Sequence, residues 1–354
     1  MSTQIDDGGA IAPRWRPWSR TGFAFASFGV ALMVAILVSL CVGRYSVSAM
    51  TALHILGEAI VHPGQAIESM DQRIVLLVRA PRVVIAAMAG AALATAGVAL
   101  QGVFRNPLVS PEVLGISQGA AFGGALAITM GIWGVPLLGI VFVGGFSALI
   151  AVGMLARING QTEILTVILS GMVVGSLFSA CVSLLQFIAD PNSSLPAIVY
   201  WLMGSFATAT WDRVLVSAPG LLLGIALLWA LRFRLNVLSL DDSEARSLGA
   251  RPDQERWLVF VLVALIVGCQ VAVSGIVGWV GLVIPHAARL IVGHDHRRLL
   301  PATALLGATF MVGVDTLART LTAAEIPLGV LTAIIGAPAF ALLLRRHFKD
   351  REAT

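Results

Sequence analysis

Long runs of apolar residues without a single charge recur along most of the chain. The longest uncharged block covers residues 113–156. A helix needs about 20 apolar residues to cross the hydrocarbon core of a bilayer, so several of these runs can span a membrane. The composition agrees, because 58% of the 354 residues are hydrophobic, 12% are charged and the mean hydropathy is +0.90. The sequence therefore predicts an all-α, polytopic membrane protein.

Counting these runs against the thickness of a bilayer predicts ten membrane spans. The glycines and the proline of GIWGVP, residues 131–136, are typical of a tight turn and divide the longest block into two crossings. Residues 195–207 are apolar but follow the turn residues Asp-Pro-Asn-Ser-Ser, so we expect an amphipathic or dipping segment there. The expected spans are residues 21–43, 74–102, 113–130, 135–156, 164–189, 213–231, 257–274, 277–292, 299–319 and 326–344.

The distribution of basic residues predicts the orientation of these spans. With the N-terminus inside, sixteen Arg or Lys residues fall on the cytoplasmic side and six on the outer side, as the positive-inside trend requires. Ten spans then leave both termini in the cytoplasm. We expect cytoplasmic tails at residues 1–20 and 347–354, and a transmembrane domain over residues 21–346 with a cytoplasmic segment at about 236–254.

Some types of chemistry are excluded by composition. The chain has twenty-two arginines and one lysine, Lys349, which no glycine-rich loop precedes, so a phosphate-binding loop is absent from this sequence. Cys41, Cys181 and Cys269 lie in apolar runs, where free thiols behave as small hydrophobic groups. We expect no disulfide.

Small residues recur at the spacing of helix contacts in membranes. Gly90 and Gly97 enclose one such stretch, and Gly171 and Gly175 enclose another. In lipid, helices associate through close backbone approach, so these residues predict helix–helix contacts rather than the wall of a pore.

Three arginines lie on the outer side, against the positive-inside trend. Arg79 and Arg82 occur in LVRAPRVV at the outer end of the second span, and Arg319 ends the ninth span four residues after Asp315. An acid four residues before a base favours an ion pair on a helix, so we expect Asp315 to be a structural partner of Arg319. The arginines could extend to lipid headgroups, or they could form a docking surface for an acidic partner, because guanidinium groups bind carboxylates bidentately.

The cytoplasmic segment contains an expected short helix at residues 238–250. Asp241 or Asp242 can cap its start, and Gly249 can take the left-handed position after its end. Its small apolar face would consist of Ala245 and Leu248. Such a helix is suited to sit in the cleft of a partner, although a solvated loop helix explains the pattern as well.

The motif His-Asp-His at residues 294–296 raises the question of a metal site. Two histidines and a carboxylate are suitable ligands, but Arg297 and Arg298 would repel a cation and no further His or Cys cluster lies nearby in sequence. We expect no metal to bind here.

Five segments of the chain together carry a resemblance to a known family. They are RAPR at 79–82, QGVFRNPLVSPEVLGI at 101–116, SGIVGWVGLVIPHAAR at 274–289, HDHRRLLP at 294–301 and EIPLGVLTAIIGAP at 325–338. Taken in this order, they resemble the FecCD-type permeases, the membrane subunits of ABC importers for ferric siderophores, haem and cobalamin. The resemblance runs from about residue 72 to residue 346. Ala80 departs from the usual RLPR-like motif but leaves both arginines in place.

This resemblance implies how the protein is assembled. It implies a homodimer or heterodimer of ten-span permease subunits in the cell (inner) membrane, surrounded by lipid, with the translocation path at the dimer interface. Two separate ABC ATPase subunits would hold ATP and magnesium, so this chain is expected to bind no cofactor and to be no enzyme. An extracytoplasmic substrate-binding protein would deliver the substrate, and no nucleic acid is expected as a partner.

The resemblance also implies roles for three groups of residues. The positions that would dock the binding protein are Arg79, Arg82 and Arg319. The positions that would couple to the ATPases are Asp241, Asp242, Glu244, Ala245, Arg246, Leu248 and Gly249. The cytoplasmic gate would consist of Gln161, Thr162, Glu163, Ile164 and Leu165.

The expected function is an importer permease that moves an iron chelate inward by ATP-driven alternating access. A ferric siderophore is the first candidate substrate, and haem and cobalamin are alternatives. An ion-coupled secondary transporter is the main rival, with Asp315 as its candidate titratable residue. A passive channel or a receptor is a third possibility.

Overall fold

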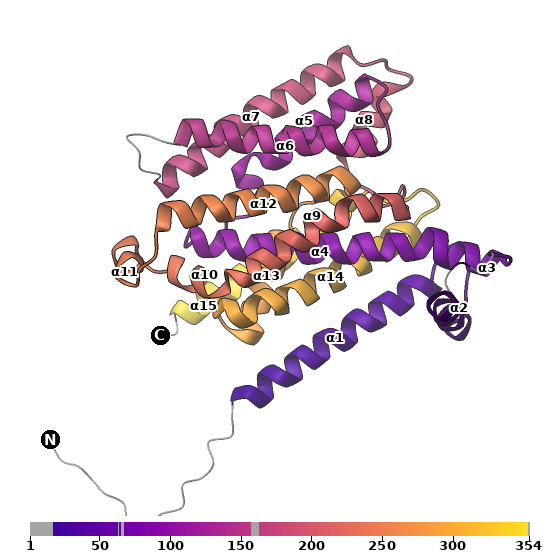
Figure 1. Ribbon diagram of the computed structural model, residues 1–354, viewed down its shortest axis with the longest axis horizontal. Helices are drawn as coiled ribbons and strands as arrows, with labels where there is room; N and C mark the ends of the chain where they lie inside the picture. The colour runs from indigo at the N-terminus through magenta and orange to yellow at the C-terminus, as the bar shows by residue number, and fades with distance from the viewer. Residues whose placement is uncertain (1–16, 63, 65–66, 157–162, 353–354) are drawn as a thin grey trace, which may run out of the picture.

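A computed structural model describes residues 17–62, 64, 67–156 and 163–352. Within these residues the chain is helical and contains no β-strand. The start of α1 and the end of α15 lie at the same end of the molecule as α11, whereas α2 and α3 lie at the opposite end (Figure 1). We call these two ends the α11 end and the α2 end.

Seventeen helical elements follow one another along the described chain. Two are not α-helical, namely the π-helical η1 and the 3-10 helix η2. The bounds are α1 Pro17–Cys41, α2 Ala49–Val61, α3 Met70–Gln72, η1 Arg73–Arg79, α4 Ala80–Val103, η2 Pro111–Leu114, α5 Ile116–Thr129, α6 Val135–Ala156, α7 Ile164–Ile188, α8 Ser194–Leu202, α9 Trp211–Ala230, α10 Arg232–Leu238, α11 Asp242–Ser247, α12 Pro252–Ser274, α13 Val280–Val292, α14 His296–Thr320 and α15 Leu328–Glu352.

Each predicted span coincides with a helix. Seven stretches of the described chain are long and apolar enough to cross a membrane: α1, the continuous run α3–η1–α4, α6, α7, α9, α12 and α14. The other three predicted spans fall on α5, α13 and α15; α5 has 14 residues, α13 has 13, and the apolar part of α15 is Leu328–Leu342. The structure therefore shows a polytopic helical bundle, and the count of ten spans stays a prediction.

Within the described residues, four further α-helices lie between the predicted spans, namely α2, α8, α10 and α11. Helix α2 is not predicted from the sequence, because its 13 residues are too short to span a bilayer and include Glu58. The expected dipping segment at residues 195–207 contains α8, which ends at Leu202.

Close contacts between glycines position the central helix α4. A Cβ atom at Gly90 would lie 2.1 Å from the carbonyl oxygen of Gly307 in α14, and one at Gly97 would lie 2.0 Å from that of Gly281 in α13. At Gly171 in α7 a Cβ atom would lie 2.1 Å from the carbonyl oxygen of Val113. The predicted small-residue contacts are confirmed, because a larger side chain at these positions would push the helices apart.

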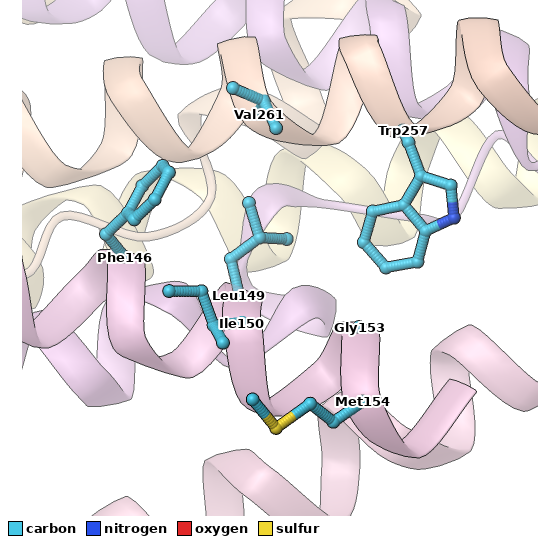
Figure 2. A pocket seen from close by; sticks show the side chains of 7 residues that line it. All are labelled: Phe146, Leu149, Ile150, Gly153, Met154, Trp257 and Val261. Atoms are coloured by element: carbon cyan, nitrogen blue, oxygen red, sulfur yellow. The ribbon is translucent and has the colours of Figure 1, made fainter. Parts of the chain in front are cut away.

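An apolar groove runs between α6 and α12 on the surface of the bundle. Figure 2 shows the Trp257 ring near Gly153, and a Cβ atom at that glycine would lie 3.2 Å from the ring. Phe146, Leu149 and Val261 also line the groove. An amphipathic tryptophan at the start of an apolar helix segment fits the boundary of a membrane.

Candidate functional site

At the α2 end, two arginines hold the C-terminal end of α1. Arg79 donates a hydrogen bond to the carbonyl oxygen of Leu40 at 2.6 Å. Arg319 donates to the carbonyl oxygen of Val42 at 2.7 Å and to Ser39 Oγ at 3.0 Å. The last carbonyls of a helix have no partner within the helix, and cations are favourable at that end of its dipole. These two arginines therefore fasten α1 to η1 and α14.

The third arginine at this end, Arg82, joins three parts of the chain. Its Nε donates to both carboxylate oxygens of Asp315 in α14, at 2.9 and 3.0 Å. Its two terminal nitrogens donate to the two oxygens of Glu325, each at 2.9 Å. The side chains of Arg82 and Asp315 are 8% and 1% exposed. A buried charge is tolerated only when it is paired and hydrogen-bonded, and this arginine meets both conditions.

All three arginines that the resemblance assigns to docking are buried in this structure. Asp315 lies 3.8 Å from Arg319 Nε, and its contacts with Arg82 are shorter. The sequence alone predicts no partner for Arg82 and gives no signal at Glu325, which lies 243 residues away in the chain. Docking stays a prediction, since a partner glutamate would compete with these existing hydrogen bonds.

At the α11 end, two arginines converge on the start of the predicted coupling segment. Arg105, in the loop after α4, donates to Asp241 at 2.8 Å and also contacts Asp242. Arg256 in α12 donates to the two oxygens of Asp242 at 3.1 and 2.5 Å. The hydrogen bond from Arg256 is the main cause that lowers the pKa of Asp242, against the opposing effect of burial, and Arg105 adds to it.

The local structure of α11 differs in part from the sequence prediction. Gly249 has a φ of +78°, as the prediction of a left-handed residue requires. Asp241 occupies the capping position, but its side chain makes no capping hydrogen bond because Arg105 binds the carboxylate. The expected apolar face is not continuous, since Ala245 is buried and Leu248 is 60% exposed.

A cleft of about 270 Å³ links this segment to the predicted gate. Glu163 and Ile164, at the start of α7, line it opposite residues of α11 and α12. Leu165 is exposed, and Gln161 and Thr162 lie outside the described residues. The remaining predicted coupling residues, Glu244 and Arg246, are exposed on α11. Predicted gate and coupling residues thus meet at one cleft, whose other lining residues are Arg105, Asp242, Arg246, Asp253 and Arg256.

The His-Asp-His motif forms the start of α14. Asp295 accepts hydrogen bonds from the backbone N–H of Arg297 at 3.0 Å and from the side chain of Asn236 at 2.8 Å. His296 is buried, and its Nδ1 lies 2.7 Å from Asn236 Oδ1. Over the ranges that the structure describes, no group of three His, Cys, Asp or Glu residues could hold a metal ion. The motif therefore serves to join α14 to α10.

The fold is that of a polytopic helical bundle with an arginine cluster at each end. The family model of the FecCD transport family matches residues 31–346. The chain belongs to this family and is a permease of the ABC importer type, in agreement with the resemblance found in the sequence.

Several relatives are similar over most of their length. A molybdate import system permease protein of Haemophilus influenzae is 46% identical, over 90% of this chain and 94% of the relative. A hemin transport system permease protein of Yersinia pestis is 41% identical, over 78% and 84%. A solved structure of a transporter described as of the metal-chelate type, in an inward-facing conformation, is 44% identical with a TM-score of 0.83, over 92% of this chain and 99% of that one.

Proposed function

We propose that this chain is the membrane-spanning permease subunit of an importer in the cell inner membrane that moves a metal-containing substrate into the cytoplasm. Two such subunits, identical or different, would enclose the path. Two separate ATPase subunits would bind and hydrolyse ATP at the α11 end, and a substrate-binding protein would deliver the substrate at the α2 end. Transport would proceed by alternating access.

The observation that carries this proposal is the attachment of α11 to the loop after α4 and to the buried Arg256 of α12. Asp242 on the surface segment is bound by Arg105, which follows α4, and by Arg256 in α12. A force applied to α11 by an ATPase would therefore reach α12 directly through Arg256 and α4 through Arg105, two residues after the helix ends. The cleft beside it extends this path to the start of α7, where the gate is predicted.

Reconstitution in proteoliposomes tests this function against ion coupling. Substrate uptake by the purified importer complex should require ATP in the compartment that faces the α11 end, and vanadate should stop this uptake. An uncoupler should have no direct effect. Uptake that persists with vanadate and stops with an uncoupler would favour the secondary transporter, in which Asp315 would carry the ion.

Two substrate classes deserve direct comparison. A ferric chelate follows from the sequence resemblance, and a probable iron chelatin transport permease of Helicobacter pylori is 41% identical over 77% of this chain. The 46% identity to a molybdate permease favours an oxyanion as the second candidate. Uptake of labelled ferric siderophore and of labelled molybdate by the same vesicles distinguishes the two substrate classes. An excess of the unlabelled form of the transported substrate should block this uptake, and an excess of the other compound should not.

Docking on the α2-end arginines needs a test that separates binding from folding. The double variant Arg79→Glu/Arg319→Glu should weaken capture of the binding protein, but both side chains also hold the end of α1. The matched variant Arg79→Lys/Arg319→Lys keeps the charges and loses the forked geometry. Unchanged affinity of a well-folded glutamate variant in detergent would contradict the docking role.

A further inference from the structure

A basic and aromatic cleft lies at the α11 end between three helices that are distant in sequence. It is lined by the start of the apolar part of α1, by the junction of α9 with α10, and by the start of α14. Arg232, Arg297 and Arg298 supply three positive charges, and Phe25 and Trp229 supply apolar walls. No carboxylate lines the cleft among the residues that the structure describes.

The guanidinium groups in this cleft are oriented by aromatic rings. The Arg232 guanidinium carbon lies 4.1 Å from the centre of the Trp229 ring and 4.8 Å from that of Phe233, and Arg297 lies 5.3 Å from the Phe233 ring. Arg232 NH1 also donates to the carbonyl oxygen of Trp229 at 3.0 Å. Stacking on a ring leaves the remaining N–H donors at the edge of a guanidinium group available to an oxyanion.

One acid beside the cleft, Asp295, forms a long ion pair with Arg297 and is also hydrogen-bonded elsewhere. Asp295 approaches Arg297 Nε only to 3.9 Å, while its other oxygen accepts hydrogen bonds from Asn236 and from the backbone at the start of α14. Other arginines of the α11 end face acids at shorter range, such as Arg234 with Glu255 at 3.6 Å. Over the part of the chain that the structure describes, the cleft is thus lined by three arginines and by no acid.

The position of the cleft fits a lipid better than a soluble anion. One wall is Thr21, the first residue of the candidate span of α1, and another is Trp229, one residue before the end of α9. The span of α1 is also the least covered of the seven, with 22% of its apolar window buried against 78% for the run that includes α4. Acyl chains could therefore lie along α1 while a headgroup reaches the arginines.

We propose that this cleft binds an anionic phospholipid, with its phosphodiester held by Arg232 and Arg297 and its acyl chains against α1. Basic pockets between helices on the cytoplasmic side of a membrane suit this class of headgroup. The bound lipid would fill the gap between α1 and the rest of the bundle. This inference depends on the membrane location of the chain and is independent of the transported substrate.

Native mass spectrometry of the full chain in mild detergent tests the proposal with defined lipids. After delipidation, phosphatidylglycerol or cardiolipin should bind more tightly than phosphatidylcholine with the same acyl chains. Glycerol phosphate, which has the anion without the chains, should bind weakly. Equal affinity for phosphatidylglycerol and phosphatidylcholine would overturn the proposal, and tight binding of glycerol phosphate would make the site one for a soluble anion.

Two triple variants with the same loss of charge locate the site. Arg232→Gln/Arg297→Gln/Arg298→Gln should lower the affinity for phosphatidylglycerol by about tenfold or more. The control Arg234→Gln/Arg246→Gln/Arg251→Gln should lower it by less than about twofold, because these arginines lie outside the cleft. Equal losses in the two triples would show a general charge effect and overturn the proposal.

Two further readouts keep the test decisive. If the cleft triple is unstable by thermal unfolding, the single variant Arg297→Gln, at a half-exposed side chain, should still lower the affinity for phosphatidylglycerol by about threefold. If the cleft variants keep full lipid affinity and lose the co-purifying ATPase subunits, the surface docks a protein and the lipid proposal is wrong.

Discussion

Arg82 at the α2 end and Arg256 at the α11 end are both buried, yet the acids that face them differ. Asp315, the partner of Arg82, is 1% exposed and belongs to a long helix. Asp242, the partner of Arg256, is 37% exposed and begins a helix of six residues at the surface. The first contact joins two parts of the bundle that must stay together, and the second joins the bundle to a segment that a partner can reach. We therefore expect substitutions at the α2 end to affect stability and those at the α11 end to affect transport.

The largest effect is expected for Arg82→Leu. Removal of this arginine leaves the buried carboxylate of Asp315 without its main partner, and breaking a buried pair in this way costs about 3–5 kcal/mol. Thermal unfolding in detergent and the yield of folded protein measure the loss. The exposed Arg73→Leu serves as the control, and the double variant Arg82→Leu/Asp315→Leu should recover part of the stability. An unfolding temperature equal to that of the wild type would contradict a structural role for the pair.

A smaller loss of stability is expected for Arg319→Gln. The shorter glutamine side chain cannot form the hydrogen bonds of Arg319 to Ser39 and Val42, so carbonyl groups at the end of α1 are left unsatisfied. The expected loss in the free energy of unfolding is about 1–3 kcal/mol. Hydrogen exchange should increase at the end of α1 and remain unchanged in α12. The variant Arg44→Gln, at an exposed arginine nearby, should change exchange far less. Uniform exchange in all helices would show that the arginine does not hold α1.

At the α11 end, Asp242→Asn should cost at most about 1 kcal/mol, because the carboxylate is partly exposed and asparagine retains one acceptor oxygen. The unfolding temperature should therefore fall much less than for Arg82→Leu under the same conditions. A loss as large as that of the α2-end variant would remove the contrast between the two ends.

The smallest effect is a dependence on pH that appears only in acid. The pKa of Asp242 is lowered from its ordinary value of 3.8, mainly by the hydrogen bond from Arg256, so its ionised contacts stabilise the protein at every pH above that value. They are lost only as the pH falls through the lower folded-state pKa. The difference in unfolding temperature between wild type and Asp242→Asn should stay constant from about pH 5 to about pH 8. A difference that disappears near neutral pH would show that this aspartate is not held by the two arginines.

Local sequence patterns predict the helices and many of their contacts. Apolar runs locate every long helix, and the small residues at Gly90 and Gly97 mark helix crossings that the structure confirms. These features depend on residues close together in the chain, because a helix buries a face that repeats every few residues. The left-handed Gly249 follows from the same local rules.

Contacts between distant residues could not be predicted in the same way. Arg82 meets Glu325 across 243 positions and Arg105 meets Asp242 across 137, and neither pairing leaves a periodic signal. Spacing alone paired Asp315 with Arg319, whereas the closer partner of that carboxylate is Arg82 on another helix. The short helix α2 was missed because the length of a bilayer span was the measure applied to each apolar run.

The most direct test of the central claim measures substrate uptake and ATP hydrolysis together in proteoliposomes that contain the importer with Asp242→Asn. If α11 drives the bundle through Asp242, uptake per ATP hydrolysed should fall by about tenfold, equivalent to about 1.4 kcal/mol of lost coupling, while the protein remains folded and its ATPase subunits remain bound. Uptake per ATP equal to that of the wild type would contradict the claim that this aspartate transmits the movement of α11 to the membrane helices.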